Sequence, residues 1–261
     1  TLDQDFTPRS MFTLQQMQTE HTLTEEIVIR NALTEDRWQW LCGAFAFAKW
    51  LDMSSPVMFK RDGIEQLILH NANKGITSSG IFPEGFASDF RIPTYGIALY
   101  HQSSAELGRW LLSAGLRLDF EHTSMRYNSN GTIPYRFNYT MSEFKPLYTE
   151  FSGREKQSFF ELLPKLAAEY RTGIGTLYAT ITRGYKAGGY NTQIFSDILQ
   201  VKMMDNMMND LGIKLNNGTS TSYDTASATR YKPEKSWNFE VGTHLRPTTG
   251  LSIDATLYWI E

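Results

Sequence analysis

The chain has 261 residues, of which 41% are hydrophobic and 13% aromatic, and a formal net charge of −3 at pH 7. This balance, without a dense Lys/Arg run, excludes the electrostatic footprint of a nucleic-acid-binding protein. A single cysteine excludes an internal disulfide, and the five histidines lack metal-ligand spacing, so neither a protein-built metal site nor a cofactor is predicted.

Apolar and polar side chains alternate with a period of two along most of the chain, which is typical of β-strands. We predict about nine strands from this pattern. They lie at residues 11–18, 22–30, 37–51, 93–102, 109–124, 156–170, 175–186, 234–246 and 251–261. Several exceed the usual strand length of globular sheets, which favours a membrane barrel.

The alternation predicts two faces with different roles. The apolar face is predicted to contact lipid, through Trp110, Leu112, Leu116, Leu118, Phe239, Val241, Leu257 and Trp259. The opposite face carries Arg117, Asp119, Glu121, Arg183 and Glu240. These charges are interpreted as lining a solute path or holding a plug domain by salt bridges, and ordinary solvated lumen charge explains them equally well.

The predicted connections are of two kinds. Those at 31–36, 103–108, 171–174 and 247–250 are short, and those at 52–92, 125–155 and 187–233 are long. Their alternation predicts an all-β, antiparallel up-and-down transmembrane barrel with short periplasmic turns and long extracellular loops. From Trp40 to Trp50 the chain climbs about 33 Å, or about 23 Å at a 45° tilt, near the apolar band of about 25 Å.

Short helices are predicted within the long loops, at Asp62–Asn73 and Ser196–Leu211. Ser196 is a candidate N-cap for the second helix, and Gly212 is a candidate stop. Met203, Met204, Met207 and Met208 have helical spacing, which favours packing over copper binding.

Three segments resemble the barrel signatures of TonB-dependent receptors: ELLPKLAAEY from Glu161, LYATITRGYKAGGYN from Leu177 and YKPEKSWNFEVG from Tyr231. Two upstream segments, EIVIR from Glu26 and WLCGAFAF from Trp40, are similar to earlier strands of that family. The resemblance implies a closed barrel of about 22 strands around a plug. It also implies import of scarce nutrients, usually iron chelates, driven by the TonB complex.

Within these signatures, Tyr185, Gly188, Gly189, Tyr190, Asn191 and Trp237 are predicted family-motif residues. The glycines are expected to relax the backbone where a strand leaves the membrane, and the tyrosines to lie at the interface. Ligand contact is the alternative interpretation. No plug, TonB box, signal peptide or aromatic-terminated closing strand is recognisable, so residues 1–261 are interpreted as a partial barrel domain.

The sequence therefore predicts part of an outer-membrane transporter for a ferric siderophore or similar metal chelate. The expected partners are outer-membrane lipid, the small-molecule substrate and the TonB complex, reached through a plug outside this chain. A passive porin or structural barrel is the first alternative, and a soluble β-rich glycan-binding module or enzyme the second. Catalytic motifs of common enzyme classes do not occur, so no enzymatic activity is predicted.

Overall fold

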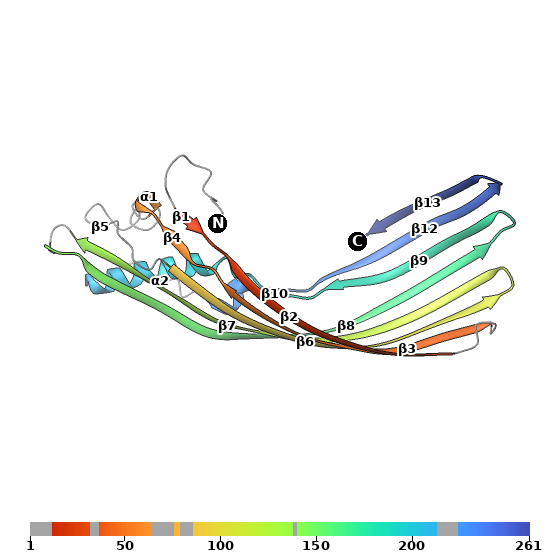
Figure 1. Ribbon diagram of the computed structural model, residues 1–261, viewed down its shortest axis with the longest axis horizontal. Coiled ribbons are helices and arrows are strands. Elements are labelled where there is room, and N and C mark those ends of the chain that lie inside the picture. Colours follow the sequence, from red (N-terminus) through yellow and green to blue (C-terminus); the bar gives the residue numbers. More distant parts are fainter. Residues whose placement is uncertain (1–11, 32–36, 64–75, 79–85, 138–139, 213–223) are drawn as a thin grey trace.

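The computed structural model describes residues 12–31, 37–63, 76–78, 86–137, 140–212 and 224–261. Eleven of its strands form one antiparallel sheet, and two short strands form a separate ribbon. Figure 1 shows a long curved sheet with tight turns at one end and the helices at the other. Among the described residues, no helix is long and apolar enough to cross a membrane.

The long strands follow one another in up-and-down order, each antiparallel to the next. They are β2 (Met17–Arg30), β3 (Trp38–Ser54), β6 (Phe86–Leu107), β7 (Trp110–Phe137), β8 (Lys145–Arg171), β9 (Gly175–Lys186), β12 (Glu234–Thr248) and β13 (Leu251–Ile260). The predicted fold class is confirmed as a partial antiparallel barrel. In the described residues β2 and β13 are the two edges, and the sheet does not close on itself.

The remaining elements lie toward the long-loop end, where β1 pairs with β4, and all but α2 are short. The strands are β1 (Phe12–Leu14), β4 (Val57–Phe59), β5 (Ile76–Ser78), β10 (Gly189–Tyr190) and β11 (Arg230–Tyr231). The helices are α1 (Arg61–Gly63), α2 (Phe195–Asp210) and α3 (Thr225–Thr229). The predicted helix at 62–73 falls mostly on residues 64–75, which lie outside the described residues.

The predicted division of the first strands is wrong. Residues 19–21, expected as a connection, belong to β2, which pairs with β3 without interruption. The break comes earlier, between β1 and β2, where the Gln15 backbone N–H donates to the Pro56 carbonyl at 3.1 Å. The structure therefore also has two strands here, β1 and β2, but they divide at residues 15–16 and not at 19–21, because backbone pairing and not the side-chain pattern decides where a strand ends.

The predicted long loop at 125–155 is also wrong. Strands β7 and β8 continue through most of it as one hairpin, with Tyr135 still opposite Lys145. Residues 86–92, expected as loop, likewise belong to β6, and 86–91 pair with β7. These segments lack the apolar outer positions that predicted the strands, yet their backbone groups find partners in a sheet that is already in place.

The two faces of the sheet exchange polarity along β7. We call the face that carries Arg117 and Asp119 the inner face, and the face that carries Trp110 and Leu116 the outer face. Beyond Phe120 the outer face becomes polar, with His122, Ser124, Arg126, Asn128 and Asn130. Over the same stretch the inner face becomes apolar and buried, with Met125, Tyr127, Ile133 and Tyr135.

Helix α2 explains the second half of this exchange, because it packs on the inner face of the extended hairpin. Met203 and Met207 are fully buried, in one cluster with Ile133 and Tyr135. Phe195 packs against Tyr127 and Phe90, with ring centroids 4.8 Å away in each case. The predicted packing role of the methionines is confirmed.

The ends of α2 agree with the prediction at one terminus only. Gly212 follows the helix with φ of 70°, so the predicted stop is confirmed. The N-cap is Ile194, without a side-chain bond, and Ser196 lies inside the helix, where its hydroxyl donates to the Gln193 carbonyl at 3.0 Å. The predicted cap at Ser196 is therefore wrong.

Candidate functional site: the polar inner wall and the loop above it

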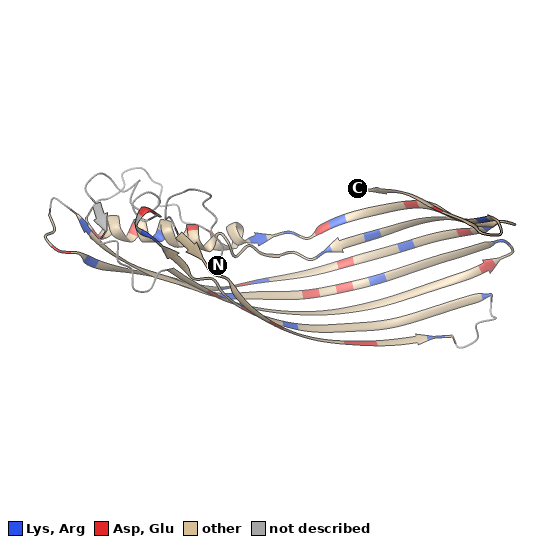
Figure 2. Cartoon of the chain, turned by 45° about the horizontal axis from the view of Figure 1, so that its top comes forward, with Lys and Arg blue, Asp and Glu red and all other residues tan. Residues whose placement is uncertain are grey.

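The inner face of the membrane-spanning part of the sheet is lined by charged side chains. Figure 2 shows red and blue bands on neighbouring strands in the half of the sheet away from the helices. Arg117 donates to the Asp119 carboxylate from Nε at 2.8 and 3.0 Å and from Nη2 at 2.8 Å. Its guanidinium also lies 5.7 Å from the centre of the Phe45 ring, which holds it against the wall.

Glu161 is the most enclosed charged group of this wall, at 5% exposure, and the sequence analysis did not single it out. It lies opposite Asp119 on the neighbouring strand. Its carboxylate pairs with the Lys235 ammonium at 2.6 Å and with the Arg183 guanidinium at 3.8 Å. Two cations are needed here because Glu161 and Asp119, side by side, would otherwise repel each other.

The cations reach Glu161 because strands β8 and β9 separate beside it. Their pairing ends at Lys165 opposite Thr182, although β9 continues to Lys186 beside β12. Pro164, which has no N–H to donate, lies directly beyond the last pair. In the opening, the Tyr185 hydroxyl donates to the Glu121 carboxylate at 3.3 Å.

The predicted charged set is thus brought together only in part. Arg117, Asp119 and Glu121 share the inner face of β7. Arg183 was predicted on this face, but the register places it directly opposite Trp237 of the outer face, and its side chain approaches Glu161 only where β8 and β9 separate. Glu240 lies apart, on β12, and accepts a hydrogen bond from the Tyr178 hydroxyl at 2.9 Å. Its face is the predicted one, but its partners are different.

A hollow of about 280 Å³ opens on this wall. Its lining combines aromatic rings with the ends of charged side chains, including Phe45, Phe47, Arg117, Asp119, Glu121 and Tyr185. Such a surface binds by charge and hydrogen bonding and offers no activated nucleophile. Within the described residues, no group of His, Cys, Asp and Glu side chains could hold a metal ion.

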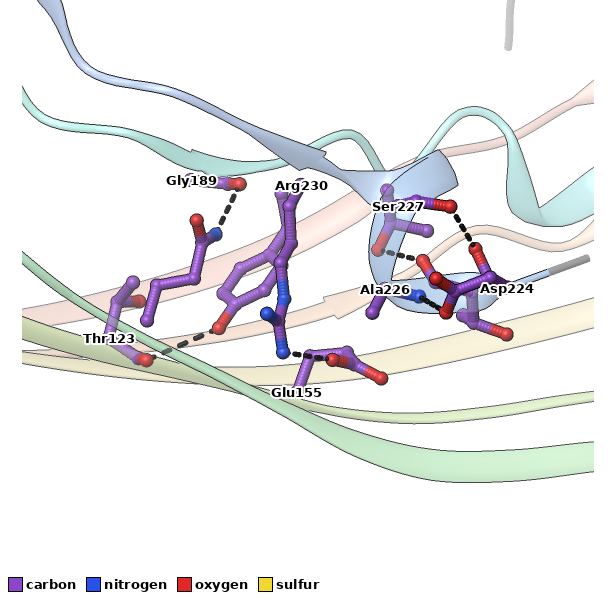
Figure 3. Close-up of polar contacts among 11 residues, drawn as sticks. Thr123, Glu155, Gly189, Asp224, Ala226, Ser227 and Arg230 are labelled. Atoms are coloured by element: carbon purple, nitrogen blue, oxygen red, sulfur yellow. Dashed lines mark hydrogen bonds and ion pairs between the residues drawn. The ribbon is translucent and has the colours of Figure 1, made fainter.

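The loop between β9 and β12 folds back over the inner face above this wall. Strands β10 and β11 pair, and the Arg230 side chain of β11 extends toward Glu155 of β8 (Figure 3). Arg230 pairs with Glu155 at 2.5 Å, and the Tyr190 hydroxyl donates to the Thr123 carbonyl at 3.2 Å. Tyr190 and Tyr185 both point to the inner face, whereas the sequence placed them at the lipid interface.

The motif residues next to Tyr190 tie the loop together. The Gly189 carbonyl accepts from the Gln157 side chain at 2.7 Å, and the Asn191 backbone N–H donates to the Thr229 carbonyl at 2.7 Å. A Cβ on Gly189 would lie 2.4 Å from the Tyr231 hydroxyl oxygen, and one on Gly188 would lie 2.5 Å from the Tyr231 carbonyl. Close packing against backbone therefore requires Gly188, whereas a side chain at Gly189 would have to displace the Tyr231 ring, and neither glycine has a positive φ.

Polar contacts also fix the far end of α2. The Asp210 carboxylate accepts hydrogen bonds from the Lys145 ammonium, at 2.7 and 2.8 Å, and from the Tyr135 hydroxyl. These bonds, Lys145 first, lower the pKa of Asp210. Burial and the neighbouring carboxylate raise the pKa of Tyr135. Asn206 adds a bond to the Thr149 hydroxyl at 3.0 Å, so the helix is held from both sides.

The predicted lipid-facing residues lie on the outer face and are exposed in the sheet: Trp110, Leu112, Leu116, Leu118, Phe239, Val241, Leu257 and Trp259. Trp237 is on the same face, where the Arg183 guanidinium lies 5.9 Å from its ring centre. Aromatic contacts mark both ends of this surface. Trp110 packs against Tyr170 with ring centroids 4.8 Å apart, and Trp50 against Tyr95 at 6.1 Å.

Sequence reasoning missed Glu161 and Lys235 although both stand within the quoted family segments. Lys235 is two residues from Trp237, so the alternation of the strand places its side chain on the outer face. Nothing in the neighbouring sequence therefore indicates that the side chain turns inward. Only the separation of β8 from β9 gives its side chain a route to Glu161. A signal was available in Pro164, whose missing N–H predicts an interruption of the ladder at this level.

Comparison with known proteins agrees with this geometry. The family model described as TonB dependent receptor-like, beta-barrel, matches residues 59–261. The structure is similar to that of the ferric yersiniabactin uptake receptor FyuA from Yersinia pestis, with 16% identity and a TM-score of 0.57, over 97% of this chain and 30% of that chain. The ferric-catecholate import receptor Fiu from K12 E. coli is similar over 93% of this chain and 31% of its own, with 15% identity and a TM-score of 0.48. No curated protein sequence matches.

The chain spans about 30% of the length of these receptor structures. At 16% identity the first of them shows a shared fold and nothing finer. The family match, by contrast, extends over most of the chain, and it agrees with an outer face that is apolar between two aromatic girdles. This chain belongs to the TonB-dependent receptor β-barrels of the bacterial outer membrane, a family of transporters and not of enzymes.

Proposed function

We propose that this chain forms part of the wall of a transporter that imports a ferric siderophore or a similar metal chelate. Residues 1–261 would then be one segment of the barrel, and a plug domain outside this segment would couple transport to the TonB complex. The observation that carries the proposal is the polar inner wall around Glu161, lying beneath a loop that folds inward.

The wall has the chemistry that a polar chelate requires. Arg117 and Arg183 present guanidinium groups, which recognise carboxylate and other planar anionic oxygens. Phe45 and Phe47 add apolar surface in the same hollow. The iron would arrive with its own ligands and be cargo, so the wall itself needs no metal site. The names of the two similar receptors, both for ferric chelates, support this substrate class.

The test uses the full-length gene product in an iron-restricted host that lacks its own siderophore receptors. Uptake of radioactive iron as a panel of ferric chelates is measured with and without a functional TonB complex. We expect uptake of one class of chelate, and this uptake should disappear without TonB. In Arg117→Ala the uptake of that chelate should fall about tenfold, which corresponds to the loss of one charge-assisted contact.

A passive porin, the alternative from the sequence, makes the opposite prediction. It would admit small solutes whether or not TonB is present, and it would conduct ions in a planar bilayer. Uptake that persists without TonB would overturn the proposal. Lys186→Gln serves as the control and should leave uptake unchanged, because it removes an exposed charge at the end of β9 that does not line the hollow beside Arg117.

A further inference from the structure

The wall contains an opening between β8 and β9 within its apolar band. The two strands pair no further than Lys165. Beyond that residue, Leu162 and Phe160 still present apolar, exposed side chains on the outer face. From Lys165 to Phe160 the strand climbs about 12 Å at about 3.3 Å per residue and a tilt of about 45°, so the opening lies inside the lipid-facing region. We call the opening between residues 160–164 of β8 and 183–186 of β9 the seam.

Side chains take the place of the backbone ladder in the seam. Backbone groups without a partner are costly in lipid. Arg183 donates from Nη1 to the Leu162 carbonyl at 3.4 Å, and its guanidinium lies 3.8 Å from the Glu161 carboxylate. The Lys235 ammonium lies 2.6 Å from the same carboxylate. Both cations start from outer-face positions beside Trp237 and cross the wall to reach Glu161. The seam is therefore closed by side chains, and these can part without breaking a backbone ladder.

The seam borders the hollow of the inner wall. Leu163 of β8 and Tyr185 of β9 stand on its two sides, and both also line that hollow. Arg117 and Phe45 line the hollow as well, so it combines a charged group with apolar surface. On the lipid side of the seam, Phe160 is exposed. Apolar side chains therefore continue from the hollow through the seam to the lipid.

We propose that the seam is a lateral portal, which binds the hydrocarbon chain of an amphiphilic metal chelate. The polar head of the chelate lies in the hollow beside Arg117, and its chain passes between Leu163 and Tyr185 into the outer leaflet. A chain that leaves the aqueous lumen for lipid gains about fourfold in affinity for each methylene group transferred. This inference rests on the proposed import of a chelate and specifies that chelate as one with an apolar chain.

The test is photolabelling of the full-length gene product in phospholipid vesicles. The probes are a hydroxamate, a catecholate and a hydroxycarboxylate chelate of ferric iron, each with a dodecanoyl chain. Each is made with a diazirine either at the chain end, as the tail probe, or on the chelating group, as the head probe. Because the bound head tethers the chain, we expect a tail probe to label residues 160–164 at least about tenfold more strongly than Leu257, which faces lipid on β13. The corresponding head probe should label the hollow at Phe45 and Phe47.

A variant of the seal tests whether the ion pairs close the seam. Glu161→Gln removes the carboxylate that holds Arg183 and Lys235, and should raise labelling by the tail probe about threefold, the effect of one half-exposed ion pair. The control, Glu169→Gln, removes a carboxylate from the same face of β8, where it pairs with Arg171 at 3.8 Å, away from the seam. It should be labelled like the unchanged protein. Folding of both variants is checked by the heat-induced shift of their electrophoretic mobility.

The two kinds of probe separate this inference from the proposed function. A head probe that labels the hollow, with a tail probe that labels only the lumen or the lipid-facing surface at large, would overturn the portal and leave chelate import standing. Labelling of the seam by a tail probe, in a protein without TonB-dependent uptake, would support the portal and overturn import. Absence of labelling by every probe would contradict both. Equal labelling of Glu161→Gln and the unchanged protein would overturn the closing of the seam by its ion pairs, and with it the portal.

Discussion

The hairpin of β7 and β8 contains two regions built on opposite principles. In the membrane region the outer face is apolar and the inner face charged, as Leu116 and Arg117 illustrate. In the region beyond the membrane the outer face is polar and the inner face is buried, as Thr132 and Ile133 illustrate. A single pair of strands forms both regions, because side chains alternate between the two faces of a strand whichever face meets water. What differs is the neighbour: lipid outside in one region, helix α2 inside in the other.

The largest effect is expected from a charge placed on the inner face of the part of the hairpin that lies beyond the membrane. Ile133→Arg places a cation in the fully buried cluster beneath α2, without a partner. We expect a loss of about 3–5 kcal/mol in the stability of the docked helix. Guanidinium titration of the full-length protein in lipid vesicles, followed by protease cleavage within residues 187–233, measures it. Thr132→Arg, on the outer face, should change little, and equal damage from both would disprove the assigned faces.

In the membrane region, an arginine should be destabilising on the outer face and tolerated on the inner face. Leu116→Arg puts a cation on the lipid-facing surface near the midplane, at a cost of about 2–4 kcal/mol. Arg117→Ala, one residue away, should be tolerated in assembly because its side chain lies on the polar inner wall. The yield of folded barrel in vesicles and its denaturation midpoint compare the two. Similar tolerance at both positions would contradict the exchange of polarity.

The opening between β8 and β9 is tested through its ion pair. Lys235 is half exposed while Glu161 is enclosed, so solvent screens the pair only in part. A double-mutant cycle with Lys235→Met and Glu161→Gln should give a coupling of about 1 kcal/mol. The control cycle uses Lys186 at the end of β9 and Glu234 at the start of β12, whose charged groups are 3.8 Å apart and mostly exposed. Their coupling should be close to zero, and a larger value there than at Glu161 would argue against an enclosed site.

The smallest effect expected is a pH dependence of α2 docking. Because hydrogen bonds from Lys145 and Tyr135 lower the pKa of Asp210, the ionised carboxylate favours the docked helix. This contribution is fully present above the ordinary pKa of 3.8 and is lost as the pH falls through the lower, folded value. Methyl NMR signals of Met203 and Met207, followed from pH 6 to pH 2.5, should report the loosening.

Variants at two of the three acidic positions of α2 show whether Asp210 is responsible. Asp210→Asn should loosen the helix at neutral pH and remove most of the dependence. Asp205→Asn, on the same helix, should retain it. An unchanged titration in Asp210→Asn would assign the effect to another group.

Much of the membrane region could be predicted from local pattern. The alternation from Trp110 to Phe120 contains both the strand and its facing, since lipid and lumen each select one class of side chain. The hairpin beyond it could not be predicted in the same way. Its outer positions, such as Asn128 and Asn130, are typical of loops, and its apolar inner positions have a reason only once α2 is packed against them.

The sequence by itself determined the strands of the membrane region, the short turns at one end of them, the stop of α2 at Gly212 and the family. Each of these depends on residues close together in the chain. Only the tertiary structure decided that Lys235 meets Glu161 and that Tyr185 and Tyr190 turn inward. These depend on the register between strands and on where pairing ends, and backbone hydrogen bonds to distant segments set both.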